Sequence, residues 1–183
     1  MRVPQISRRR LLAGAGGALL GASAVVAIFR TTGYDVPDEI AGALQSLDPW
    51  EYVLLQHAAR RICASDRPGD SSIPTADDTN VAGFADSYIA TMPADLRSDL
   101  KKLIALVEHL APLSIGYRAR FTKLDRDAQD RVLASLESND VALLRGGFAG
   151  LKSLIFMGYY RDPRTWRMLG YDGPRVGRPA AGW

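Results

Sequence analysis

Few residues in this sequence are suited to catalysis or metal binding, and they are scattered. His57 and His109 lie 52 positions apart, and a single cysteine, Cys63, excludes an internal disulfide, a cysteine-built metal site and covalent haem attachment. Asp77 and Asp78 are adjacent, so on a helix their carboxylates would point in different directions. No nucleophile, base and orienting group occur together. The sequence therefore predicts no catalytic, cofactor-binding or metal site in this chain.

We interpret each of these groups as structural. His57 falls near an apolar helical stripe and is expected to be buried and hydrogen-bonded. His109 is expected near a helix C-terminus, where the helix dipole favours a partly charged imidazole. Cys63 is expected to be a small core residue. Asp77 and Asp78 are expected in the first turn of a helix, where acids complement the dipole.

The chemistry that the sequence does offer is that of recognition. Residues 156–174 hold three arginines and four residues of the Tyr/Trp type, and these residue types are enriched at binding hot spots. Two interpretations stay open: a C-terminal helix cap packed on its own core, or a partner-binding patch. The residues of the candidate patch are Tyr159, Tyr160, Arg161, Arg164, Trp166 and Tyr171.

The N-terminus has the pattern of an export signal. Arg8 and Arg9 precede a charge-free apolar run over residues 11–29, as in signals read by the twin-arginine translocase. Small residues up to Ala24 predict a cleavage site, so residues 1–29 are either a cleaved signal or a retained anchor; a basic cytosolic arm is the remaining alternative. We expect export to the periplasm, with or without a tether to the inner membrane. Because this route carries folded proteins, a small chain without a visible cofactor site is expected to carry a partner.

The net charge of +3 arises in the leader. Residues 1–24 contain four arginines and no acid, which leaves 19 basic against 20 acidic residues in the rest of the chain. A near-neutral body, in a chain with 47% hydrophobic residues, predicts a folded domain. It also lacks the strongly basic balance typical of nucleic-acid binding, so no nucleic-acid partner is expected.

Beyond the leader, apolar residues recur at spacings of three and four, and no stretch alternates with a period of two. The predicted fold class is therefore all-α: a single compact bundle of five to six helices with an irregular C-terminal tail. We expect residues 30–47 to form a linker with a short helix near 38–47, residues 48–174 the helical domain, and residues 175–183 a Gly/Pro/Arg tail.

Caps and prolines set the predicted helix boundaries. Four helices are predicted over about residues 48–65, 81–92, 93–111 and 125–136. A break and cap at residues 138–140 precede a fifth helix that reaches Ile155. A short helical turn is predicted after Asp162 and Pro163. The predicted core stripe of the third helix is Leu96, Leu100, Leu103, Val107 and Leu110.

The C-terminal block also resembles a known family. Gly158-Tyr159-Tyr160-x-Asp162-Pro163-x-x-Trp166, followed by Gly170-Tyr171-x-Gly173-Pro174, is similar to the C-terminal signature of subunit 3, the small or gamma subunit, of gluconate 2-dehydrogenase-type complexes. The resemblance extends over about residues 46–175, and the C-terminal block is its specific part.

This resemblance implies a non-catalytic helical partner of a large FAD-dependent oxidoreductase of the GMC type, which acts on sugars or other alcohols. FAD would reside in that partner, and a multihaem cytochrome c would accept the electrons. The small subunit would bind the flavoprotein, assist its maturation and export it. Apart from the resemblance, two alternatives stay open: a stand-alone exported helical ligand-binding protein and a membrane-tethered structural protein.

Overall fold

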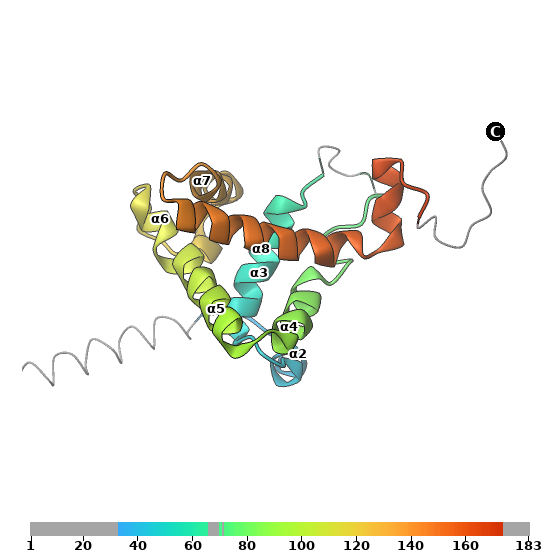
Figure 1. Cartoon of the computed structure of the whole chain (residues 1–183), viewed down its shortest axis with the longest axis horizontal. Coiled ribbons are helices and arrows are strands. Elements are labelled where there is room, and N and C mark those ends of the chain that lie inside the picture. The colour runs from blue at the N-terminus through green and yellow to red at the C-terminus, as the bar shows by residue number, and fades with distance from the viewer. Residues whose placement is uncertain (1–32, 66–69, 71, 174–183) are drawn as a thin grey trace, which may run out of the picture. The chain divides into compact units, whose positions relative to one another are not determined.

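The structure is a computed structural model that describes residues 33–65, 70 and 72–173 (Figure 1). The chain divides into two compact units, Met1–Asp35 and Val36–Trp183, and the second contains every described helix. These helices are α2 (Asp38–Ala43), α3 (Pro49–Ile62), α4 (Val81–Thr91), α5 (Ala94–His109), α6 (Ala111–Ser114), α7 (Arg126–Glu137) and α8 (Ala142–Tyr160). Two 3₁₀ helices, η1 (Phe121–Lys123) and η2 (Pro163–Leu169), complete the fold.

The predicted all-α class is confirmed, since no strand occurs in the part of the chain that the structure describes. Within the same residues, no helix combines the length and hydrophobicity needed to span a bilayer. The predicted export signal with Arg8 and Arg9, and the tail over residues 175–183, lie outside the described residues.

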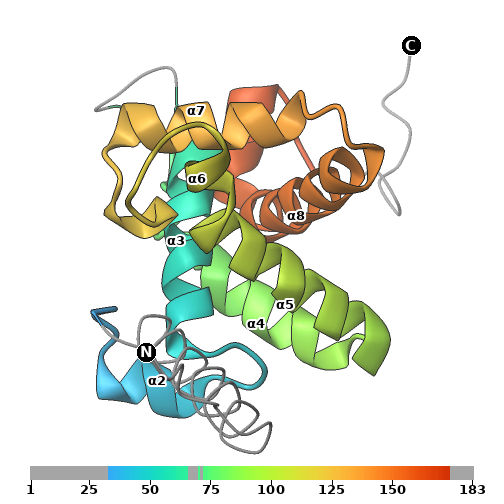
Figure 2. The same ribbon diagram turned by 90° about the vertical axis from the view of Figure 1, so that its left-hand side faces the viewer.

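Helix α3 forms the centre of the bundle and packs against α4, α5, α7 and α8 (Figure 2). Its start follows the sequence prediction: Pro49 occupies the first turn, and Asp48 and Glu51 form a capping box. The Asp48 amide donates a hydrogen bond of 2.8 Å to the Glu51 carboxylate. The largest fully buried apolar side chains come from α3 itself and from α4, α5, η1 and α8: Leu54, Leu55, Ile89, Ile104, Phe121, Phe148, Leu151, Ile155 and Tyr159.

Helices α4 and α8 approach closely at Gly158. A Cβ atom at this position would lie 2.9 Å from Cδ1 of Phe84 and 3.2 Å from Cγ1 of Val81. Both distances are shorter than an ordinary van der Waals contact, so a larger residue would fit only if the side chains of Phe84 and Val81 shifted. This contact fixes the C-terminal end of α8 against α4.

Two buried carboxylates bind irregular segments to the helices. Asp86 on α4 accepts backbone hydrogen bonds from Gln45, Ser46 and Leu47 at 2.8–2.9 Å. Glu108, fully buried on α5, accepts bonds from the amide and hydroxyl of Thr122 at 3.1 and 2.6 Å. Burying a carboxylate is costly unless it is well hydrogen-bonded, and both groups meet that condition.

Three sequence predictions about helix ends require correction. Pro93 is the N-cap of α5 and not its first helical residue, and Pro112 lies inside the short helix α6. Val141 is the N-cap of α8, and no side chain caps that helix, whereas residues 138–140 were predicted to do so. Asp125 caps α7 as predicted, since its carboxylate accepts a hydrogen bond from the Ala128 amide at 2.8 Å.

The predicted core stripe of the third helix is wrong at two of its five positions. Leu96 and Leu110 are 56% and 59% exposed, Leu100 and Leu103 are half-buried, and Val107 is the one fully buried residue of the predicted stripe. The interior face of α5 is instead formed by Ile104, Val107 and Glu108. The leucine stripe therefore faces away from the core over much of its length.

Candidate partner-binding surface

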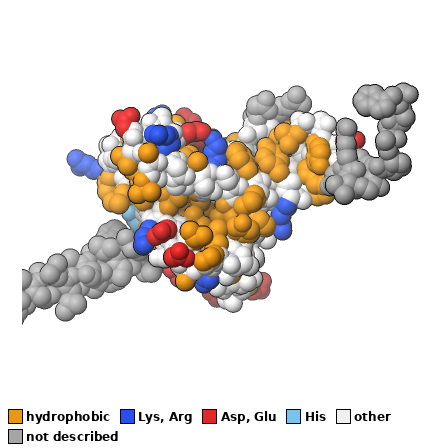
Figure 3. Space-filling view, in the orientation of Figure 1, with side chains coloured by type: hydrophobic (Ala, Val, Ile, Leu, Met, Phe, Trp, Pro, Cys, Tyr) orange, Lys and Arg blue, Asp and Glu red, His pale blue; other side chains and the backbone are white. Residues whose placement is uncertain are grey.

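An apolar groove of about 600 Å³ runs between α5 and α8 and is closed at one end by α4. In Figure 3 its hydrophobic side chains gather in the middle of the face on which Figure 1 shows these three helices. The walls include large apolar side chains with much of their surface in solvent: Tyr88, Leu96, Met157 and, at 83% exposed, Leu143. We call these walls and the residues between them the α5–α8 groove.

The groove exists because α5 and α8 carry more apolar residues than the core can cover. On α5, Ile104 and Val107 point into the interior, while Leu96, Leu100 and Leu103 line the groove. On α8, the buried Leu151 and Leu154 form the groove floor, and Leu143 and Met157 lie at its two ends. Exposed apolar side chains that gather in one hollow mark an interaction site more often than single exposed leucines do.

Charge is almost absent from the α5–α8 groove. Its lining contains one acid and one base, Asp99 and Lys102. Their side chains are both 72% exposed, and Lys102 Nζ donates a hydrogen bond of 2.8 Å to Asp99. The groove therefore offers an occupant apolar contact and very little polar orientation.

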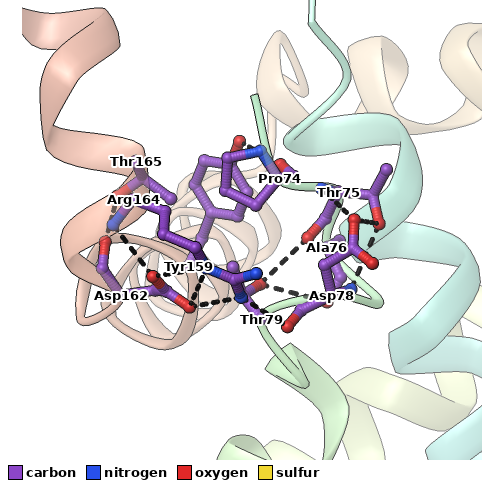
Figure 4. A network of polar contacts seen from close by, with 9 residues as sticks. All are labelled: Pro74, Thr75, Ala76, Asp78, Thr79, Tyr159, Asp162, Arg164 and Thr165. Carbon is purple, nitrogen blue, oxygen red and sulfur yellow. Dashed lines mark hydrogen bonds and ion pairs between the residues drawn. The ribbon is translucent and has the colours of Figure 1, made fainter. Parts of the chain in front are cut away.

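The C-terminal block that the sequence singled out is built around a buried tyrosine. Tyr159 is only 2% exposed, and its hydroxyl donates a hydrogen bond of 2.8 Å to the carbonyl oxygen of Pro74 (Figure 4). Nearby, the Asp162 carboxylate caps η2 by accepting from the Arg164 amide at 2.9 Å, and Arg164 donates to the Asp78 carbonyl oxygen at 2.9 Å. Tyr159 is thus a core residue, which corrects its place in the candidate surface patch.

The other residues of the candidate patch lie together at the end of α8 and on η2, partly engaged with one another. Trp166 is half-buried, donates from its indole nitrogen to the Tyr160 carbonyl oxygen at 2.7 Å, and meets the Tyr171 ring edge-on at 5.3 Å. Arg161 lies 5.1 Å from the ring centre of Phe84, a cation–π arrangement. Arg161, Arg164 and Tyr171 keep exposed surface. The block therefore serves first to bind η2 to α8 and to the loop before α4.

The two histidines lie on different helices, in separate surroundings. His57 is half-buried and accepts at Nδ1 the 3.0 Å hydrogen bond of Gln129, whose amide nitrogen also donates to the Phe121 carbonyl oxygen. Burial lowers the pKa of His57, and repulsion from Arg60 adds to the effect. His109 is the last residue of α5 and stacks obliquely against Trp50 at 5.6 Å. The Gln129 amide thus orients the His57 ring, and His57 has a structural role.

The remaining chemical groups are engaged or inert. Burial raises the pKa of Cys63 to about 12, so the thiol carries almost no reactive thiolate at neutral pH. Asp77 pairs with Arg60 at 2.7 Å, and Asp78 accepts from the Thr75 amide and hydroxyl at 2.8 and 2.7 Å. Both acids precede α4 and do not lie in its first turn, which corrects the prediction made for them. Among the described residues no group of three or more His, Cys, Asp or Glu side chains is placed to hold a metal ion.

A comparison with known protein families finds a match that covers this helical domain. The family described as gluconate 2-dehydrogenase subunit 3 matches residues 49–173. The chain belongs to this family. No curated protein and no solved structure gives a significant match.

As a gluconate 2-dehydrogenase subunit 3 protein, the chain is a small subunit of a dehydrogenase complex that includes a catalytic partner. The matched region begins at the first residue of α3 and ends beyond η2. It therefore contains the C-terminal block up to Gly173 and all three helices that line the α5–α8 groove.

The sequence predictions placed a candidate partner-binding patch in the C-terminal block and did not identify the groove. Two signals in the sequence point to it. The apolar residues of α8 surround more of that helix than one core face requires, because Leu143 and Met157 lie off the face of Phe148 and Ile155. In addition, three glycines at positions 146, 147 and 150 interrupt the first half of α8.

Proposed function

We propose that this chain is a non-catalytic small subunit that binds a large FAD-dependent dehydrogenase of the GMC type, helps it to mature and exports it. The large subunit carries the FAD and acts on sugars or other alcohols, and a multihaem cytochrome c takes the electrons. The small subunit contributes protein surface. Membership of a dehydrogenase subunit family supports this proposal, as does the leader pattern at Arg8 and Arg9.

The observation that carries the proposal is the α5–α8 groove in a member of a subunit family. An isolated soluble protein would lose little by replacing Leu143, which is 83% exposed, with a polar residue. Burial of this side chain and its neighbours by another protein would instead stabilise an assembly, at roughly 25 cal/mol for each Å² of apolar surface removed from water. The groove is therefore the surface best suited to a protein partner.

A small-molecule function is less consistent with this groove. Ligand sites place several polar groups among apolar walls so that they fix the orientation of the ligand. Here the polar side chains of the lining are Asp99 and Lys102, which bond to each other, and the phenol of Tyr88. The described residues thus offer an apolar contact face without the polar set that would select a sugar or another alcohol.

Affinity capture tests the proposal. The full chain, tagged at its C-terminus and expressed in its native host, is isolated from the periplasmic and membrane fractions. We expect a large protein with flavin absorbance to be recovered with it, together with a haem-staining cytochrome when the membrane fraction is used. Recovery of the chain alone, from both fractions and at wild-type expression level, would contradict the proposal. A monomer that retains a lipid or sugar would support the stand-alone ligand-binding alternative.

A further inference from the structure

The glycines of α8 leave the α5–α8 groove open to another backbone. Gly147 and Gly150 lie in the middle of a helix and line the groove. A Cβ atom at Gly150 would meet no atom within 4 Å, and the nearest atom to one at Gly147 would be in the side chain of Leu103, at 3.4 Å. Glycine destabilises the interior of a helix relative to alanine. Packing within this chain does not require a glycine at position 150. The space that it leaves lies on the side where an occupant would pack.

The dimensions of the groove fit a helix. Its residues on α8 run from Leu143 to Met157, and 14 residues at 1.5 Å each give a length of about 21 Å, or about four helical turns. The two long walls, α5 and α8, are themselves helices, whose side chains form ridges and grooves into which a third helix packs.

An extended segment would suit this groove poorly. The walls are helical, so their backbone N–H and C=O groups bond within α5 and α8 and are not offered to an occupant. A strand or loop pressed between such walls would bury backbone polar groups without partners, at a high free-energy cost. A helix satisfies its own backbone and needs only apolar side chains on one face.

The charged residues of the groove also restrict which helix can bind there. Among the described residues that line the groove, the only charged ones are Asp99 and Lys102, which balance each other at the rim. The complementary face is therefore apolar and without net charge, whereas an acidic or basic helix would find no counter-charge among the groove residues.

A second copy of this chain is poorly equipped to supply such a helix. Among the described helices, α2 and α6 have six and four residues, too few for four turns. The exposed residues of α7 are almost all charged or polar. The apolar residues of α3 are buried in its own core, apart from Pro49 and the half-buried Ile62. Only the groove walls themselves present a long exposed apolar face in the part of the chain that is described.

We infer that the α5–α8 groove receives one amphipathic helix of the catalytic flavoprotein subunit, about four turns long, whose apolar face lies along α8 with its backbone close to Gly147 and Gly150. This inference rests on the proposed function, because the catalytic subunit supplies the helix. It adds the binding mode and the point of closest approach.

A matched pair of leucine substitutions on α8 tests the inference. Gly150→Leu fills the space that the partner's backbone occupies, whereas Ala149→Leu adds a leucine at a neighbouring exposed position that does not line the groove. The full chain in each form is titrated with the co-expressed, FAD-loaded catalytic subunit, and thermal unfolding of each isolated variant is recorded. We expect Gly150→Leu to melt at or above the wild-type temperature and to bind about tenfold more weakly or worse. Ala149→Leu should bind like the wild type.

Cross-linking supplies a second readout that does not depend on the stability of a glycine variant. A photo-reactive amino acid at position 143, which is exposed, should capture a segment of the catalytic subunit with apolar residues spaced by three and four. Capture of an irregular segment, or wild-type affinity in Gly150→Leu, overturns the inference while the complex, and with it the proposed function, remains. Absence of a complex with the wild-type chain overturns both. A wild-type homodimer cross-linked through position 143, or an apolar small molecule retained in the groove, also overturns the inference.

Discussion

The hydroxyl of Tyr159 donates a 2.8 Å hydrogen bond to the carbonyl oxygen of Pro74, a residue 85 positions earlier in the chain. Both residues are buried, and the bond joins the end of α8 to the loop that precedes α4. Arg164 reinforces the junction by donating to the Asp78 carbonyl oxygen from η2. The C-terminal block is thereby part of the architecture that holds α8 and α4 in place beside the groove.

Tyr159→Phe should destabilise the fold by about 1–2 kcal/mol, because the Pro74 carbonyl oxygen loses its donor in a buried place. Urea denaturation of the isolated chain measures this. Tyr171→Phe is the matched control, since Tyr171 is 45% exposed, and it should leave the free energy of unfolding within about 0.5 kcal/mol of the wild type. Equal stability of the two variants would show that the bond does not contribute.

Asp86→Ala should be among the more damaging single substitutions, at about 2–4 kcal/mol, because three backbone amides at residues 45–47 lose one shared acceptor. Denaturation again provides the free energy, and limited proteolysis should show earlier cleavage near residues 44–48. Asp99→Ala removes an exposed carboxylate and should change the stability by less than about 0.5 kcal/mol. An Asp86→Ala protein as stable as Asp99→Ala would refute the assigned role.

The stability of the fold should fall as the pH is lowered below about 6.5, with His57 as one cause. Burial and the charges of Arg60 and Lys123 lower the folded-state pKa of His57 below its usual value of 6.5, and Asp77 opposes them in part. Between the two pKa values the unfolded chain binds more protons than the folded chain, so acid favours unfolding.

His57→Gln tests this assignment, because a glutamine can still accept a hydrogen bond from Gln129 but does not titrate. Unfolding free energies are measured at several pH values between 5 and 8. The wild type should lose stability toward low pH more steeply than His57→Gln does over this range. Parallel curves for the two proteins would exclude His57 as a source of the pH dependence.

Leu143→Ala should weaken binding of the catalytic subunit by more than about fivefold, because the complex loses buried apolar surface, while the isolated chain keeps its stability. Leu113→Ala on α6 is the control, since Leu113 is also largely exposed but does not line the groove. Titration with the purified partner gives both affinities. Equal affinities of the two variants would remove Leu143 from the interface.

Local signals in the sequence predicted the long helices α3, α4, α5, α7 and α8, but not the short helices α6 and η1. Asp48, Pro49 and Glu51 predicted the start of α3, and Asp125 predicted that of α7, because capping depends on residues within one turn. Which apolar face becomes core depends on the neighbouring helices. Leu96 and Val107 belong to one apolar stripe of α5, yet only Val107 is covered, because α8 diverges from α5 along the groove.

The same distinction explains what was wrong in the candidate patch. Tyr159 has the residue type of a hot spot, but its partner, Pro74, lies 85 residues away in sequence, and no local pattern reveals such a contact. Asp86 and Glu108 were missed for a similar reason. A carboxylate on a helix is expected in solvent, and only the fold shows the backbone amides and hydroxyl that satisfy these two.

The measurement that tests the account most directly is the location of the catalytic subunit when Arg8 and Arg9 are both replaced by lysine. The translocase reads a paired guanidinium that an ammonium group does not reproduce, so the double variant should remain in the cytoplasm. Immunoblots of both proteins and dehydrogenase assays are carried out on periplasmic and cytoplasmic fractions. We predict that the unaltered flavoprotein stays in the cytoplasm with the variant, and that periplasmic activity is lost. Normal export of the flavoprotein while this chain is retained would contradict the claim that the small subunit carries it.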